Sequence, residues 1–270
     1  MALIPPFFLD CVVSIGVPGQ SEASWIGTGF IVGRPTINEQ GEKKFHTFLV
    51  TNKHVLLNKK NILLRFNTVQ GNQVIDYPID LEPDGTLIWI GHAVEEIDIA
   101  TFTINPDVLA NDAAKFSFFS LDDHVMCVAD MLGEGVSEGD SIFILGFPMG
   151  IVSAQSNHVI SRAGSIARIR DVLESRQSSF LIDANIFPGN SGGPVVIRPE
   201  ISSIQGTSAI NKAALIGIVK SYLTYSDVAI SQQTGKPRVI FEENSGLAFV
   251  ETVDNIKSAV DLCYELKVPK

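Results

Sequence analysis

The chain has 270 residues, of which 45% are apolar, and it carries a formal net charge of −10. That apolar share is enough for a real hydrophobic core, in one large domain or two modest ones, and it excludes a disordered chain. The acidic balance, without a long run of Lys or Arg, argues against nucleic acid as a partner.

Short apolar runs separated by Gly, Pro, Asn and Asp dominate the chain. Runs of this length predict the strands of an all-β sandwich or barrel, and alternating helices are missing. The less regular stretch 104–135 predicts a connection between two β units, and the polar segments 34–44, 198–212 and 225–240 predict surface loops. In chain order, we expect strands within 8–17, 25–33, 45–52, 61–66, 86–91, 98–104, 141–147, 180–186, 194–197, 214–223 and 246–251.

The first candidate for catalytic chemistry is a histidine. "HTFLVTNKHVLL" places His54 just beyond an apolar strand, where a side chain can enter a cleft while its backbone stays anchored. An imidazole with a pKa near 6.5 suits a general base. Any single histidine is more often a satisfied surface or core residue, and this holds for His46, His92, His124 and His158.

A carboxylate that could orient this base lies further along the chain. "AVEEIDIATFTI" places Asp98 alone among apolar residues at the start of a strand, whereas Glu95 and Glu96 look like solvated neighbours. A carboxylate that enters an apolar strand is costly unless it is paired or hydrogen-bonded. In isolation, Asp98 could equally be a strand-edge residue exposed to water.

The stretch "IFPGNSGGPVVI" surrounds Ser191 with three glycines, Gly189, Gly192 and Gly193. Each glycine costs conformational entropy on folding and therefore needs a reason. One reason is an ordinary tight turn. The other is a nucleophile loop, in which Ser191 is exposed and nearby N–H groups converge to stabilise a negatively charged oxygen.

The string G-N-S-G-G also matches the nucleophile elbow of α/β-hydrolases, in which the histidine follows the serine. All five histidines of this chain precede Ser191. The order His, Asp, Ser is that of chymotrypsin-like enzymes, so the elbow interpretation is excluded.

Near the C-terminus, Val253, Ile256, Val260 and Cys263 recur at spacings of three and four residues. This period predicts an amphipathic helix with Thr252 as its N-cap. Because its polar face is mixed in charge, we expect the helix to dock on a barrel and not on a membrane surface.

Three widely spaced cysteines, Cys11, Cys127 and Cys263, argue against a disulfide framework and fit a reducing compartment. No Cys/His cluster suggests a metal, and no complete dinucleotide loop suggests a cofactor, so we expect neither. The N-terminus lacks a basic start, and no run reaches the length of a membrane span. We therefore expect a cytoplasmic protein.

Taken in order, "GTGFIV", "TNKHV", "DIATFTI", "EGDSIFILGFPMG" and "IDANIFPGNSGGPVV" resemble the trypsin-like serine peptidases, and among them the Deg/HtrA type most. The resemblance runs from about residue 24 to about residue 265. It implies two six-stranded antiparallel β-barrels with the catalytic groups between them. The expected units are an N-terminal barrel over 1–120 with His54 and Asp98, a C-terminal barrel over 121–251 with Ser191, and a docked helix over 252–270.

The resemblance also implies a role for each residue. Ser191 would attack the scissile carbonyl, His54 would carry the proton, and Asp98 would orient the imidazole. The N–H groups of Gly189 and Ser191 would form the oxyanion hole. By the same resemblance the specificity pocket would have Asn185 at its floor, Ile186 beside it, and a wall from 220–223 that includes Ser221 and Tyr222. Without an acid at the floor, an uncharged side chain of small or medium size is expected.

Two features depart from the family patterns. Digestive members have an aspartate before the nucleophile that pairs with a new N-terminal amine, whereas this chain has Asn190. Activation by N-terminal cleavage is therefore not expected. After the resembling region no PDZ module is expected either. Sensing of peptide tails, as in Deg-type proteases, is therefore not expected of this chain.

These observations predict a serine endopeptidase that acts on a protein or peptide through an acyl-enzyme. The alternative is a catalytically silent domain used for binding, or one that a regulatory partner activates, and an esterase would use the same groups. Membrane and nucleic acid are not expected as partners. The sequence leaves the substrate and the oligomeric state open.

Overall fold

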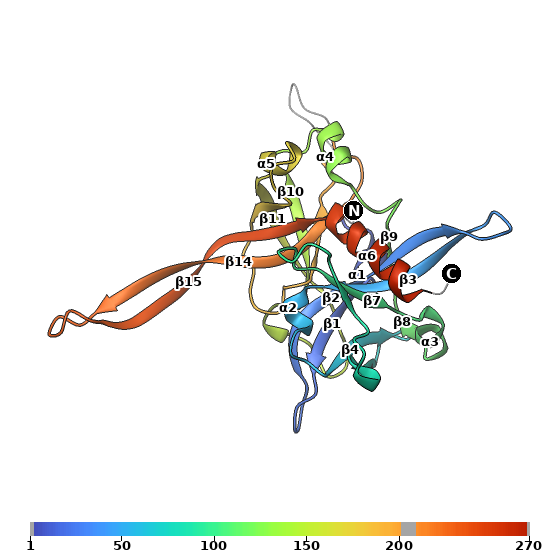
Figure 1. Ribbon diagram of the computed structural model, residues 1–270, viewed down its shortest axis with the longest axis horizontal. Helices are drawn as coiled ribbons and strands as arrows, with labels where there is room; N and C mark the ends of the chain where they lie inside the picture. Colours follow the sequence, from blue (N-terminus) through green and yellow to red (C-terminus); the bar gives the residue numbers. More distant parts are fainter. Residues whose placement is uncertain (1–2, 201–208, 269–270) are drawn as a thin grey trace.

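A computed structural model describes residues 3–200 and 209–268. Two sheets, antiparallel except for the parallel pairing of β9 with β2, lie side by side, and a C-terminal helix covers the seam between them (Figure 1). A core cluster that includes Phe30, Phe48, Leu145, Leu215 and Ile256 draws residues from both sheets and from the helix. The chain is thus mainly β, as the sequence predicts.

The first sheet contains nine strands, in the order β5-β4-β1-β2-β3-β7-β6, with β8 paired to β4 and β9 paired to β2. The prediction of a closed six-stranded barrel is wrong for this sheet, because β5 and β6 stay at its two ends. β6 has only two residues, and a 3₁₀ turn at Pro83–Gly85 interrupts the chain between them. The elements are α1 (Pro6–Leu9), β1 (Val12–Val17), β2 (Ser24–Ile37), β3 (Lys43–Thr51), α2 (Lys53–Leu56), β4 (Asn61–Thr68), β5 (Val74–Asp80), β6 (Ile90–Gly91), β7 (Ala100–Thr103), α3 (Pro106–Asn111), β8 (Ala114–Lys115) and β9 (Phe119–Ser120).

The second sheet is a closed barrel of six strands in the order β10-β11-β12-β15-β14-β13, which confirms the prediction for this half. Apolar side chains from its strands fill its interior. Its elements, with the preceding helix and a second 3₁₀ turn, are α4 (Val128–Glu134), β10 (Ser141–Gly146), the turn Pro148–Gly150, β11 (Ile160–Arg168), α5 (Arg170–Leu173), β12 (Ser179–Asp183), β13 (Pro194–Ile197), β14 (Ala214–Ile230) and β15 (Pro237–Thr252).

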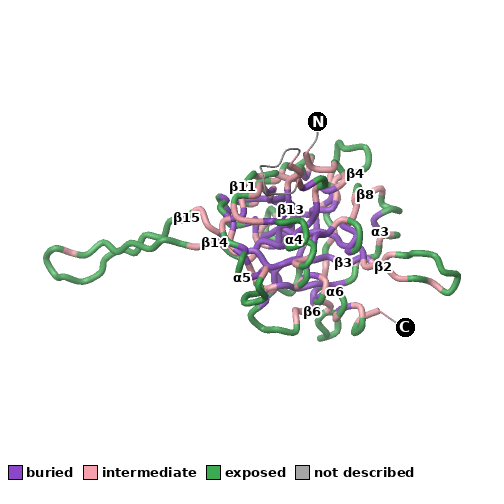
Figure 2. Tube along the Cα trace, turned by 90° about the horizontal axis from the view of Figure 1, so that it is seen from above, coloured by how far each residue is buried: buried purple, intermediate pink, exposed green. Residues whose placement is uncertain are grey.

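The main differences from the sequence expectations are the strands β5 and β11 and two of the expected loops. The sequence does not predict β5 or β11, because polar residues interrupt both and much of each strand is exposed. The expected loop 225–240 consists mostly of the ends of β14 and β15, which project from the body as a long exposed hairpin (Figures 1 and 2). The expected loop 34–44 likewise takes in the ends of β2 and β3. Of the expected loop 198–212, residues 201–208 lie outside the described residues.

The predicted C-terminal helix is present as α6 (Val253–Lys267), and Thr252 is its N-cap residue, although its side chain makes no capping hydrogen bond. The apolar face of α6 contacts β7 of the first sheet and β14 of the barrel. Polar contacts fix it as well, since His92 Nε2 lies 2.6 Å from Ser258 Oγ and Arg34 pairs with Asp261 at 2.6 Å. The helix therefore ties the two sheets together.

The three cysteines are free thiols. Cys11 and Cys263 are buried, and this burial raises the pKa of the Cys263 thiol to about 11 and that of Cys11 well above its ordinary value. Both side chains are part of the core at the seam. Among the helices of the described chain, none has the length and apolarity that a membrane crossing requires.

We predict that Ile256→Ala lowers the free energy of unfolding by about 2 to 5 kcal/mol, because it opens a cavity where α6 meets both sheets. Urea denaturation measures the change. The matched control is Leu266→Ala on the same helix, where the side chain is 61% exposed and a change within about 0.5 kcal/mol is expected. Similar losses for the two variants would show that α6 does not dock through this face.

Candidate active site

His54 and Asp98 meet at the edge of the first sheet. His54 is the second residue of α2, directly after β3, and Asp98 lies between the buried residues Ile97 and Ile99 before β7. The carboxylate contacts His54 twice, since Oδ2 is 2.5 Å from Nδ1 and Oδ1 accepts the backbone N–H at 3.1 Å. A proton held on Nδ1 in this way leaves Nε2 free to accept another.

Two side chains next to His54 hold the segment that leads to Asp98. Asn52 is fully buried and donates from Nδ2 to the Asp98 carbonyl oxygen at 2.7 Å. The Lys53 ammonium donates to the carbonyl oxygens of His92, Val94 and Glu95 at 3.1 to 3.2 Å. A charged donor shared among several carbonyls fixes the backbone from which the carboxylate projects.

A second lysine reaches the same segment from the barrel. Lys220 donates to the carbonyl oxygen of Glu96 at 2.9 Å and pairs with Glu251 at 2.8 Å. Glu251 is fully buried and also accepts from Asn255 Nδ2 at 3.0 Å, so its charge is paired and hydrogen-bonded as burial requires. The sequence suggests no such role for Lys53 or Lys220. The carbonyls of Glu95 and Glu96 anchor the segment, although these residues look merely solvated in the sequence.

The Ser191 loop has the backbone shape that requires glycine. Gly189 has a φ of +94° and Gly192 a φ of +83°, in the region that residues with a Cβ rarely adopt. A Cβ at Gly189 would collide with the carbonyl oxygen of Phe147, and one at Gly192 with that of Thr28. Conformation and space thus both exclude other residues at these two positions.

Thr28 of β2 joins the first sheet to this loop. Its N–H donates to the Ser191 carbonyl oxygen at 3.0 Å, and its hydroxyl donates to the Gly189 carbonyl oxygen at 2.7 Å. The same hydroxyl accepts the N–H of Phe147 at 3.1 Å, and the side chain is fully buried.

The loop also lies against the segment that carries His54. A Cβ added at Gly27 would be 2.8 Å from the Val55 side chain and 3.6 Å from the Ser191 carbonyl oxygen. Ser191 and the neighbour of His54 therefore approach the same point of β2. Within the described residues, however, the Ser191 hydroxyl makes no hydrogen bond to His54.

Two N–H groups of the loop, those of Gly189 and Ser191, are expected to form an oxyanion hole. The Pro188 carbonyl oxygen accepts from Met149 N at 2.5 Å, which turns the N–H of Gly189 to the opposite side of that peptide plane. Neither this N–H nor that of Ser191 donates to an acceptor among the described residues. Donors without a partner in the fold are what the stabilisation of a developing oxyanion needs.

Asn190 closes the loop on itself. Its side chain is fully buried, its Oδ1 accepts the Phe187 N–H at 3.2 Å, and its own N–H donates to the Phe187 carbonyl oxygen at 3.0 Å. Its Nδ2 has no partner among the described residues.

The four residues expected at the specificity pocket differ in their surroundings. Asn185 and Ser221 are exposed, and Tyr222 is half-buried against the barrel core. Ile186 is only 1% exposed and belongs to that core, so its side chain faces away from solvent. Its carbonyl oxygen accepts from Asn244 Nδ2.

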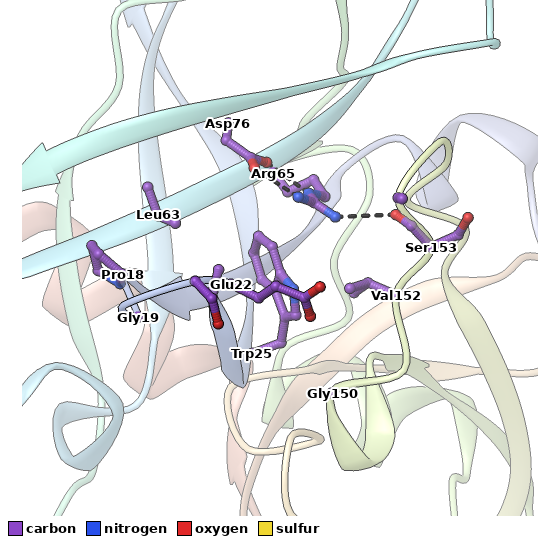
Figure 3. Close-up of a pocket in the computed structure, with 13 residues that line it drawn as sticks. Pro18, Gly19, Glu22, Trp25, Leu63, Arg65, Asp76, Gly150, Val152 and Ser153 are labelled. Atoms are coloured by element: carbon purple, nitrogen blue, oxygen red, sulfur yellow. Dashed lines mark hydrogen bonds and ion pairs between the residues drawn. The ribbon is translucent and has the colours of Figure 1, made fainter.

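A cavity of about 620 Å³ lies where the two sheets meet, between the β1–β2 turn and the loop after β10 (Figure 3). Arg65 carries its guanidinium 4.3 Å from the centre of the Trp25 ring. It also pairs with both carboxylate oxygens of Asp76 and donates to the Ser153 carbonyl oxygen at 3.0 Å. Glu22 also lines the cavity, and none of the predicted catalytic residues does.

Within residues 3–200 and 209–268, no three His, Cys, Asp or Glu side chains gather as metal ligands would.

Comparisons with known proteins agree with this architecture. A family model described as a trypsin-like peptidase domain matches residues 27–198, which is more than half of the chain. Among solved structures, the apo form of the MamO protease domain from Magnetospirillum magneticum is similar, with 18% identity and a TM-score of 0.50. The match covers 94% of this chain and 97% of that one, and at this identity it bears on the fold alone. No curated protein matches the chain.

We predict that Thr28→Val lowers the free energy of unfolding by about 2 kcal/mol, because it leaves the buried Phe147 N–H and Gly189 carbonyl without their partner. Chemical denaturation measures this loss. Thr103→Val, at the exposed end of β7, is the matched control and should stay within about 0.5 kcal/mol of the native chain. A Thr28 variant as stable as this control would contradict the joining role of the hydroxyl.

Proposed function

Because the chain belongs to the trypsin-like peptidase family, we propose that it is a serine endopeptidase with His54, Asp98 and Ser191 as its catalytic residues. The observation that carries the proposal is the double contact of the Asp98 carboxylate with the ring and the backbone of His54. A carboxylate placed in this way selects one tautomer and one orientation of the imidazole.

In the proposed mechanism, the Ser191 hydroxyl attacks the carbonyl carbon of the scissile peptide and His54 Nε2 takes its proton. The negative oxygen of the tetrahedral intermediate accepts hydrogen bonds from the N–H groups of Gly189 and Ser191. The imidazolium, stabilised by Asp98, then gives its proton to the leaving amine, and water hydrolyses the acyl-enzyme by the same steps.

The proposed substrate is a protein or peptide with an uncharged side chain before the scissile bond, because Asn185 gives the proposed pocket floor no charge. Ile186 would contribute only its backbone, whereas Ser221 and Tyr222 would form the wall. Asn190, already bonded to Phe187, needs no N-terminal amine as a partner, which supports activity without N-terminal cleavage.

A second candidate function is a domain that stays silent until a partner binds. The specific observation in its favour is that, in the described chain, the Ser191 hydroxyl is not hydrogen-bonded to His54. For the first candidate the same observation has a physical reason, because in unliganded sites such a bond is often long and tightens only with substrate.

We predict that a fluorophosphonate probe labels the native protein, whereas Ser191→Ala and His54→Ala are not labelled. Asp98→Asn should lower kcat by about 10⁴-fold, because it destroys the tautomer preference. Ser161→Ala on the exposed side of β11 is the matched control and should be labelled like the native chain. Labelling that persists in Ser191→Ala would refute the site, and a native chain that is never labelled would favour the silent domain.

We also predict that a peptide library is cut after small or medium uncharged residues, and that Asn185→Asp adds cleavage after Lys or Arg. A carboxylate at the floor pairs with a cationic side chain that the amide cannot hold. Mass spectrometry of the cleaved library gives both profiles. Strong cutting after Arg by the native chain would overturn the pocket assignment and leave the catalytic residues untouched.

A further inference from the structure

The part of the β14–β15 hairpin from Thr224 to Asn244, here called the arm, projects into solvent (Figures 1 and 2). β14 pairs with β13 only over Ala214–Ile218, and β15 pairs with β12 only over Leu247–Glu251. In the arm each strand therefore has one neighbour and one open edge. Six large apolar side chains of the arm are exposed: Tyr225, Val228, Ile230, Val239, Ile240 and Phe241.

A projecting hairpin of this kind is expected to pack against a partner. A two-stranded hairpin is at best marginally stable in water by itself, and a long open edge with apolar residues invites pairing with another strand. Apolar side chains are exposed on both faces of the arm, because Ile240 lies opposite Val228 on one face whereas Val239 and Phe241 are on the other.

The sequence of β15 indicates which partner pairs with the arm. Its apolar centre, Val239–Phe241, follows the basic residues Lys236 and Arg238 and precedes the acidic residues Glu242 and Glu243. Within the described residues, none of these four charged side chains takes part in an ion pair. Because antiparallel pairing of a strand with its own copy reverses the order, the basic end of one strand meets the acidic end of the other.

We propose that the open edge of β15 pairs antiparallel with the same edge of a second copy of this chain, with the two Ile240 residues at a two-fold axis. Arg238 of each copy then lies opposite Glu242 of the other, and Val239 lies opposite Phe241. The two arms form one four-stranded sheet. Such an interface is isologous, so it closes at two copies.

The pairing also places like side chains on like faces. Arg238, Ile240 and Glu242 alternate on one face of β15, and Ile240 lies opposite Val228 of its own β14. Val239 and Phe241 are on the other face, where an aromatic residue opposite a β-branched one is a favourable cross-strand pair. The open edge of β14 over 224–230 carries only one charged residue, Asp227, and offers no such match.

The test measures mass and not activity, so its outcome is independent of the proposed peptidase function. Sedimentation velocity over about a hundredfold range of concentration should show a reversible dimer of the native chain. Arg238→Glu and Glu242→Arg should each weaken dimerisation by at least about tenfold, because each places like charges opposite each other twice in the dimer. Lys59→Glu, in an exposed turn of the first sheet, is the matched charge change and should leave the dimer intact.

The decisive experiment mixes the two variants. Arg238→Glu supplies two acidic positions and Glu242→Arg two basic ones, so an equal mixture regains both contacts and should associate as tightly as the native chain. The double variant Arg238→Glu/Glu242→Arg should dimerise with itself for the same reason. A native chain that stays monomeric overturns the proposal, and so does a mixture that fails to associate although far-ultraviolet circular dichroism shows both variants folded.

Discussion

Two sheets that pair only within themselves have to be held in a fixed relation, and the hydrogen bonds of Thr28 do much of this. One buried residue supplies a backbone donor to Ser191, a hydroxyl donor to Gly189 and an acceptor for Phe147. Each of these groups would be costly to bury alone. The distance between the first sheet and the Ser191 loop is therefore set by hydrogen bonds of Thr28, and breaking them would leave buried polar groups without partners.

The parts of the candidate site that could be predicted are those that residue type and order along the chain indicate. The isolated Asp98 in an apolar strand indicates a paired carboxylate, and the structure gives it His54 as a partner. The glycines around Ser191 indicate a special backbone, and the positive φ values of Gly189 and Gly192 bear this out. Lys53 and Lys220 could not be foreseen, because a flexible ammonium leaves no periodic pattern and its acceptors are carbonyls that only the tertiary fold brings within reach.

Much of the fold follows from the apolar runs of the sequence. The strands that the sequence does not predict are those in which apolar residues are few or interrupted. The buried strands and α6 show a clear period, whereas β5 and β11 alternate between exposed and half-buried positions and look polar. The arm looks like a loop in the sequence because few of its side chains belong to the core. Closure of the first sheet is expected from the resemblance, whereas in the structure β5 and β6 stay unpaired with each other at its two ends and β6 has only two residues.

β14 is a continuous strand of 17 residues, which at roughly 3.3 Å per residue extends for about 55 Å. In the first half of this strand, Val219 accepts the Gly192 N–H and donates to the Gly193 carbonyl oxygen, and the next residue is Lys220. Register shifts lie at 219–221 and 222–224, where a sheet bends most readily. These bending positions lie between the tip of the strand and the Ser191 loop, so a change in the direction of the arm is accommodated next to Lys220, whose side chain donates to the Glu96 carbonyl oxygen.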